Sequence, residues 1–173
     1  MGPHPAVLPE ATLEASRAID WVGRNEFDFT CKEVAEGKPL PEIKGLSFRQ
    51  ADGSITHNPD RELIADMDAL PSVADVYRRD LDISRYYIGY LQHPYISIYT
   101  GRGCPAQCSF CLWPQTIGGH RYRVRSAANV IEEVRRMKGM FPDVKEYFFD
   151  DDTFTANLPR ARQIASGLGD ARV

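Results

Sequence analysis

The stretch YISIYTGRGCPAQCSFC at residues 95–111 decides the fold more than any other part of the chain. Apolar and polar residues alternate over Tyr95–Thr100, which predicts a strand that ends at the following glycine. A C-x3-C-x2-C run then supplies Cys104, Cys108 and Cys111. Three thiolates at this spacing can converge on one inorganic centre, because soft sulfur ligands suit iron–sulfur clusters and zinc. Reactive sites of parallel α/β sheets and barrels lie at this carboxyl end of the strands.

The chain after the cysteines reads as alternating helix and strand. Ser126 is a suitable N-cap for a helix over 127–140, which carries an apolar stripe at helical spacing. A short strand is expected at 146–149 and a second helix at 158–168. The order strand, loop, helix, strand, helix predicts an α/β fold with a parallel sheet.

The chain before residue 95 carries weaker patterns. We expect a helix at 11–18, a strand at 19–22 and a second helix at 27–35. Runs at 43–48 and 55–57 flank a turn-rich spacer and predict a β-hairpin.

Three segments follow from these patterns: a first domain over 1–57, a proline-containing linker over 58–94, and a second domain over 95–173. The charge balance changes sign near the second boundary, with 10 Lys and Arg against 16 Asp and Glu in 1–93, but 11 against 8 in 94–173. This basic excess is too small to predict a nucleic-acid partner.

The composition is that of a globular protein. Of 173 residues, 43% are hydrophobic and 26% charged, which argues against a disordered, collagen-like or coiled-coil chain. We find no apolar run long enough for a transmembrane segment and no secretory signal, so we expect a cytoplasmic location. Clustered cysteines in a reducing compartment indicate metal binding or catalysis rather than disulfides.

The cysteine run leaves two alternatives open. With His120 as a fourth ligand, the three cysteines could form a structural zinc site, and they could also be unligated thiols. Three cysteine ligands would leave one iron of a [4Fe–4S] cube without a protein ligand. Cys31, in a helical pattern, is expected to be a packed thiol.

The loop closely resembles the signature of the radical S-adenosylmethionine (SAM) enzymes, through Thr100-Gly-Arg-Gly103 followed by C-x3-C-x-Phe-C, with Phe110 as the aromatic residue. The resemblance implies a [4Fe–4S] cluster held by Cys104, Cys108 and Cys111 and a fourth iron chelated by SAM. Reductive cleavage of SAM would release a 5′-deoxyadenosyl radical, and a flavodoxin- or ferredoxin-type donor would supply the electron.

The acidic run Asp150-Asp-Asp152 resembles the end of the second barrel strand in cobalamin-type members of this superfamily. That likeness implies that Asp151 and Asp152 contact the amino group of SAM, since a carboxylate at hydrogen-bond range suits an ammonium donor. An acidic cluster after a strand is also commonly a solvated turn.

The N-terminal residues resemble the late part of a cobalamin-binding domain, in which a Gly-Pro-His loop lies near the corrin. Gly2 and His4 would be the residues near cobalamin. No Asp-x-His-x-x-Gly motif is present, so cobalamin itself is expected only as a possible cofactor. The fold class implied is α/β: the tail of a Rossmann-like cobalamin-binding-type domain, then the first βα units of a radical SAM partial TIM barrel, truncated.

Over most of its length the chain resembles hopanoid-biosynthesis-associated radical SAM proteins of the HpnJ type, mainly through residues 113–123 and 148–154. This implies a hopanoid lipid substrate, a role in forming the cyclitol ether head group, and a peripheral place at the inner membrane. The short length predicts a fragment. A rival within the superfamily is a cobalamin-dependent methyltransferase, and a rival outside it is a non-catalytic zinc module.

Overall fold

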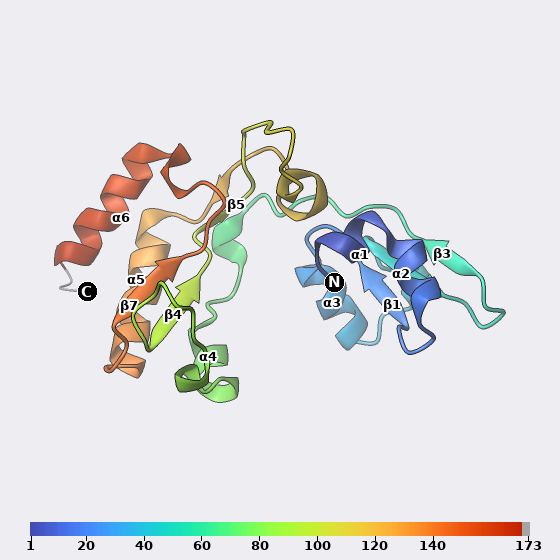
Figure 1. Ribbon diagram of the computed structural model, residues 1–173, viewed down its shortest axis with the longest axis horizontal. Helices are drawn as coiled ribbons and strands as arrows, with labels where there is room; N and C mark the ends of the chain where they lie inside the picture. The colour runs from blue at the N-terminus through green and yellow to red at the C-terminus, as the bar shows by residue number, and fades with distance from the viewer. Residues whose placement is uncertain (171–173) are drawn as a thin grey trace. The chain divides into compact units, whose positions relative to one another are not determined.

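The computed structural model describes residues 1–170, which form two compact units (Figure 1). Unit 1 contains Met1–Ile64 together with Gly103–Arg121, so the cysteine loop belongs to it. Unit 2 contains Ala65–Arg102 and the chain from Tyr122 onward. The predicted boundaries at 57 and 94 stay predictions. The last three residues of the predicted second domain, 171–173, lie outside the described residues.

Unit 1 is built on a three-stranded antiparallel sheet in the order β1-β2-β3. Its elements are α1 (Pro3–Val7), α2 (Pro9–Ala15), β1 (Trp21–Gly23), α3 (Asp28–Ala35), the 3-10 turn η1 (Leu40–Glu42), β2 (Leu46–Arg49), β3 (Ile55–His57) and the π-helical turn η4 (Pro114–Gly118). The predicted hairpin is confirmed, because β2 and β3 pair across a five-residue connection. Both pairings are antiparallel, so this sheet does not by itself have the parallel order of a Rossmann-like domain.

Two features hold unit 1 together. Ile43, Leu46 and Phe48 form its apolar cluster. The nearly buried Arg24 guanidinium donates to the carbonyl oxygens of Leu46 and Asn58, and it pairs with the Asp60 carboxylate at 2.9 Å. A buried cation with this many acceptors fixes the connection after β3 against β2.

Unit 2 contains the parallel pair predicted from the sequence. Its elements are η2 (Met67–Ala69), α4 (Ala74–Asp80), η3 (Ile83–Arg85), β4 (Tyr95–Ile98), β5 (Gly101–Arg102), β6 (Arg123–Val124), α5 (Ala127–Met140), β7 (Glu146–Phe149), η5 (Phe154–Ala156) and α6 (Leu158–Asp170). Strands β4 and β7 pair in parallel, and β5 and β6 form a separate two-residue antiparallel ribbon. Helix α4 lies in the stretch expected to be linker.

The core of unit 2 lies between the β4–β7 pair and helices α4, α5 and α6. Ile96 and Ile98 of β4 are buried together with Val130, Val134 and Met137 of α5. The expected N-cap is present, since Ser126 Oγ accepts from the Asn129 amide at 3.2 Å. The confirmed helix therefore begins where capping and the apolar stripe both predicted it.

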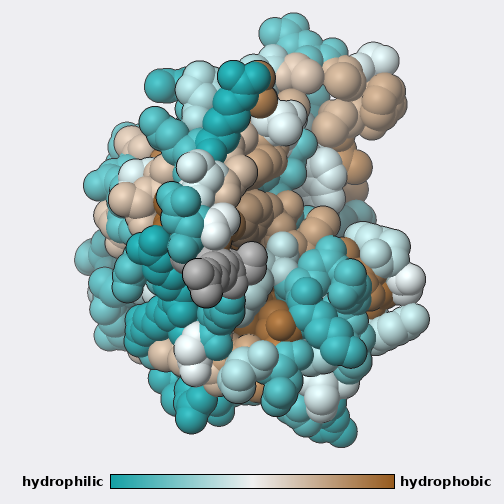
Figure 2. Space-filling model, turned by 90° about the vertical axis from the view of Figure 1, so that its left-hand side faces the viewer, coloured by the Kyte–Doolittle hydropathy of each residue, from teal (hydrophilic) through white to brown (hydrophobic). Residues whose placement is uncertain are grey.

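Figure 2 shows a face on which hydrophilic side chains surround separate hydrophobic patches. Over residues 1–170, the structure contains no helix of the length and apolar character needed to cross a membrane.

Candidate functional site

The three motif cysteines all lie in the loop of unit 1 and carry free thiols. Cys108 is exposed, while Cys104 and Cys111 are half-buried. As a donor set they fit an iron–sulfur cluster, because three accessible thiols occur within eight residues. Within residues 1–170, however, no three His, Cys, Asp or Glu side chains already lie together as a metal-binding group.

The backbone of the loop is held by short-range contacts. Gly103 has φ +90, and a Cβ there would lie 2.3 Å from the Arg121 carbonyl oxygen. Only glycine fits such a site without displacing the backbone. The Cys104 amide donates to the Gly119 carbonyl at 3.2 Å, and the Cys111 amide donates to the Cys108 carbonyl at 3.1 Å. Residues 108–111 thus form a turn, and the start of the cysteine run is tied to the residue that follows η4.

Phe110, the aromatic residue of the signature, is 87% exposed. Leu112 and Trp113 after the last cysteine are also exposed. A run of large apolar side chains in water is costly unless something covers them. These residues therefore give the cysteine loop an exposed apolar surface.

In unit 2, polar and charged side chains lie at the carboxyl ends of β4 and β7. Asp151 Oδ1 accepts from the Thr100 amide at 2.6 Å, and Oδ2 accepts from the Thr100 hydroxyl at 2.5 Å and the Tyr122 hydroxyl at 2.6 Å. Asp150 and Asp152 are exposed. Of the two carboxylates predicted to contact SAM, Asp151 is therefore already engaged within unit 2, and their predicted role in SAM binding stays a prediction.

Arg160 of α6 completes this network. Its guanidinium donates to the carbonyl oxygens of Thr100 at 2.7 Å and Arg125 at 2.6 Å, and its carbon lies 5.9 Å from the centre of the Phe154 ring. Burial, followed by the Asp151 carboxylate, raises the pKa of Tyr122 well above its ordinary value. Tyr122 is therefore a protonated donor to Asp151 at neutral pH.

The N-terminal candidates lie beside the cysteine loop within unit 1, because α1 packs against η4. His4 is exposed on α1, and Gly2 precedes the helix with φ +115. Gly2 and His4 are thus brought to the segment that directly follows the cysteines, while their predicted contact with cobalamin stays untested.

Sequence reasoning missed Thr100, Tyr122 and Arg160 as site residues. Thr100 stands inside the quoted motif, and Tyr122 lies between two arginines in a stretch for which the sequence indicated no role. Arg160 occupies a predicted helix, where a single arginine gives no signal of burial. Only the tertiary contacts of Asp151 and Arg160 bring the three together.

No family model matches the chain. Among curated proteins, it is 35% identical over 174 residues to the uncharacterized methyltransferase PH0819 of Pyrococcus horikoshii, covering 95% of this chain and 35% of the relative. It is 44% identical over 100 residues to the hopanoid C-3 methylase of Methylococcus capsulatus, covering 57% of this chain and 17% of the relative. The chain thus spans about a third of the length of the first of these relatives.

Solved structures of two radical SAM enzymes have a similar fold. The methyltransferase TsrM of Kitasatospora setae, a radical SAM enzyme solved with cobalamin and a [4Fe–4S] cluster, matches with a TM-score of 0.64 at 20% identity, over 99% of this chain and 33% of its own. The cobalamin-dependent SAM radical enzyme OxsB, solved with aqua-cobalamin and SAM, matches with a TM-score of 0.67 at 18% identity, over 95% and 23%.

The chain therefore has the fold of the corresponding part of cobalamin-dependent radical SAM enzymes. This likeness of fold agrees with the resemblance expected from the cysteine loop. The finer assignment to the HpnJ type is not specifically supported, since the hopanoid relative is a C-3 methylase that matches over part of the chain. The methyltransferase relatives agree with the alternative function better than with the main expectation of hydrogen abstraction in head-group formation.

Proposed function

We propose that this chain is the part of a cobalamin-dependent radical SAM methyltransferase that carries the cluster-binding loop. The observation that carries the proposal is the C-x3-C-x2-C loop of free thiols directly after the parallel strand β4 and its ribbon strand β5. Support comes from relatives that are methyltransferases and from solved structures of the same fold that hold cobalamin, SAM and a [4Fe–4S] cluster.

Each cofactor has candidate residues in the chain. Cys104, Cys108 and Cys111 would hold the cluster and leave one iron for SAM. Phe110 and Asp152 are candidates for SAM, together with Asp151. Gly2 and His4, on the segment packed against η4, are the candidates for cobalamin. When bound, these groups supply one-electron chemistry and a methyl carrier.

The cluster is tested first, by anaerobic reconstitution of the full chain with iron and sulfide. We expect a brown protein with about four irons per chain. Cys108→Ala should lose most of that iron. Cys31→Ala is the matched control, because Cys31 lies in α3 and its thiol contacts Met1 at 2.9 Å between the two sulfurs. Iron in Cys108→Ala equal to that of the parent would refute the assignment.

The zinc alternative gives a different result in the same experiment. A colourless protein that retains one zinc and no sulfide would point to a structural site with His120 as the fourth ligand. His120→Ala would then release the metal, whereas in the cluster proposal this variant keeps its iron.

Methyl transfer and hydrogen abstraction are separated by their products. A cobalamin-dependent methyltransferase forms S-adenosylhomocysteine, whereas a radical SAM enzyme that only abstracts hydrogen forms 5′-deoxyadenosine alone. We therefore propose product analysis after chemical reduction in the presence of cobalamin, with the cysteine variants as blanks. Formation of 5′-deoxyadenosine without S-adenosylhomocysteine would favour the reading in which only a radical is generated.

The substrate and donor are further proposals. A hopanoid lipid is favoured by the match to the hopanoid C-3 methylase. The exposed apolar residues Phe110, Leu112 and Trp113 suit an apolar ligand or cofactor. A flavodoxin- or ferredoxin-type protein would deliver the electron, and a lipid substrate would bring the enzyme to the inner membrane surface. Binding to vesicles with and without hopanoid tests the lipid part.

A further inference from the structure

Both stems of the cysteine loop are tied to a single carboxylate in unit 2. The loop leaves unit 2 after Arg102 and returns at Tyr122, and β5 and β6 pair as a ribbon at this point. Asp151, two residues after β7, accepts two hydrogen bonds from Thr100 on the outgoing stem and one from Tyr122 on the returning stem. Three of the roughly four acceptor positions of a carboxylate are thereby used.

The stems are also fitted closely to each other. A Cβ at Gly101 would lie 2.6 Å from a ring carbon of Tyr122 and 2.9 Å from the Arg123 carbonyl oxygen. Thr100 is fully buried, so its backbone groups need partners inside the protein. Its amide is satisfied by Asp151, and its carbonyl oxygen accepts from the Arg125 amide and from Arg160.

We infer that Asp151 is a positioning residue that anchors both stems of the cysteine loop to the end of β7, with Arg160 holding the outgoing stem from α6. The inference rests on the proposed function only in that the anchored loop is the one that holds the cluster. Under the proposed function, Asp152, which is exposed on the same turn, remains the candidate for the amino group of SAM.

Shape and charge separate an anchor from a SAM contact. Asparagine has nearly the shape of aspartate and can still accept the Thr100 amide, while the two hydroxyls turn to accept from its NH2 group. It lacks the negative charge that an ammonium group requires. Asp151→Asn should therefore preserve the anchor but not a SAM contact, and Asp151→Ala should lose both.

The first measurement uses the full chain without cluster, so it is independent of the proposed function. Amide hydrogen exchange over residues 99–102 and 122–125 should become at least about tenfold faster in Asp151→Ala, because the hydrogen bonds to a charged group are lost. Asp151→Asn should exchange close to the parent. Asp143→Ala, which removes an exposed carboxylate between α5 and β7, should leave both segments unchanged.

The second measurement uses the reconstituted chain. Asp151→Ala should retain less iron and sulfide than the parent after desalting, whereas Asp151→Asn retains both and keeps the change that SAM causes in the spectrum of the reduced cluster. Asp152→Asn should keep the iron and lose that spectral change. If Asp151→Ala is insoluble, Tyr122→Phe carries the test with Tyr87→Phe, an exposed tyrosine, as its control.

The inference is overturned if Asp151→Asn and Asp151→Ala lose the SAM-dependent spectral change equally while exchange in both stems stays at the parent level. Asp151 would then be a SAM contact and not an anchor. A parent chain that takes up no cluster would refute the proposed function instead. Faster stem exchange in Asp151→Ala would still support the anchor in that case.

Discussion

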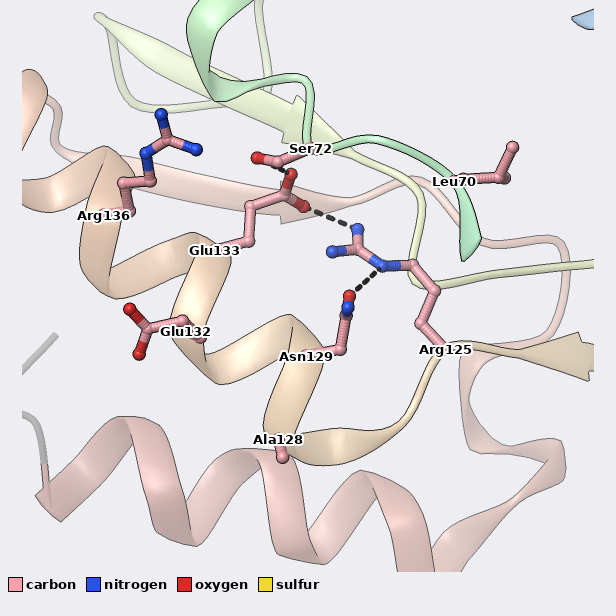
Figure 3. Close-up of a pocket in the computed structure, with 8 residues that line it drawn as sticks. All are labelled: Leu70, Ser72, Arg125, Ala128, Asn129, Glu132, Glu133 and Arg136. Carbon is pink, nitrogen blue, oxygen red and sulfur yellow. Dashed lines mark hydrogen bonds and ion pairs between the residues drawn. The ribbon is translucent and has the colours of Figure 1, made fainter. Parts of the chain in front are cut away.

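The buried carboxylate of Glu133 links three other residues in unit 2, and its removal should destabilise that unit sharply. Glu133 lies on α5 and is 4% exposed. It accepts from the Ser72 hydroxyl at 2.5 Å and from the Arg125 guanidinium at 2.5 Å (Figure 3). It also accepts from the Val73 amide at 3.0 Å. One side chain thus joins α5 to the chain before α4 and to the end of β6.

The size of the effect follows from what remains after truncation. Glu133→Ala leaves the Arg125 guanidinium, whose side chain is 11% exposed, without its ion-pair partner. Breaking a buried ion pair in this way typically costs about 3–5 kcal/mol. Arg125 keeps the Asn129 side chain at 2.7 Å and the Tyr99 carbonyl at 3.2 Å as acceptors, so we expect the lower end, about 3 kcal/mol.

The assay is urea unfolding followed by far-ultraviolet circular dichroism, which reports all the helices of the chain, of which α5 and α6 are the longest. Tryptophan fluorescence in the same samples records unit 1, because Trp21 and Trp113 both belong to it. Glu132→Ala is the matched control, since Glu132 is the preceding residue of α5 and is exposed. A surface substitution of this kind changes the free energy of unfolding by about 0.5 kcal/mol or less.

Glu133→Gln separates charge from hydrogen bonding. It keeps an acceptor for part of the network but not the ion pair, so its loss should lie between those of the alanine variants, at about 1–3 kcal/mol. The reasoning is refuted if Glu133→Ala loses no more free energy of unfolding than Glu132→Ala. Equal losses in Glu133→Gln and Glu133→Ala would instead assign the whole effect to the ion pair.

Four further predictions follow from other contacts. Ile98→Ala should lower the free energy of unfolding of unit 2 by about 2–5 kcal/mol in urea titration, because it empties a buried core position. Gly103→Ala should speed proteolysis of the cysteine loop, since any Cβ meets a backbone oxygen and φ is positive. Burial alone would raise the pKa of Glu33, but Arg61 and Lys38 outweigh it and hold the pKa below its ordinary value. The ionised Glu33 therefore stabilises the fold above the unfolded carboxyl pKa of about 4.3, and this stabilisation is lost as pH falls through the lower folded pKa. In acid titrations, the free energy of unfolding of Glu33→Gln should therefore fall less steeply with decreasing pH than that of the parent. Burial and Asp151 raise the pKa of Tyr122. The contribution of the protonated Tyr122 to the free energy of unfolding is therefore present below the ordinary tyrosine pKa of about 10, and it is lost only as pH rises toward the raised pKa. Parent and Tyr122→Phe should thus release equal tyrosine protons near pH 10 by absorbance titration, and one extra proton in the parent would contradict this.

Where the local sequence pattern and the burial of the side chains agree, the sequence alone predicted the helix correctly. Helix α5 was predicted at its observed bounds because its stripe faces the core and Ser126 supplies the cap. Helix α2 begins at Pro9 and ends at Ala15, whereas the prediction was 11–18. The missed signal is the proline at the first helical position, where its fixed φ and missing N–H suit a helix start.

Features that depend on distant partners were beyond the sequence. Strands β5 and β6 have two residues each, too few for any periodicity, and they exist because a loop of nineteen residues returns to its starting point. The turn η4 was not predicted, and its π-helical form arises where the Gly119 amide reaches the Pro114 carbonyl oxygen at 3.0 Å.

The acidic run illustrates how the structure changes a functional interpretation. In the sequence, Asp151 and Asp152 are adjacent carboxylates after one strand, and nothing distinguishes their chemistry. The fold turns Asp151 toward Thr100 and Tyr122, 51 and 29 positions away, and leaves Asp152 exposed. A carboxylate that accepts three hydrogen bonds has little capacity left for an ammonium ligand. Two residues that a motif treats as equivalent therefore differ in their contacts. The asparagine variants test whether Asp151 holds the stems of the cysteine loop and whether Asp152 is needed for the response to SAM.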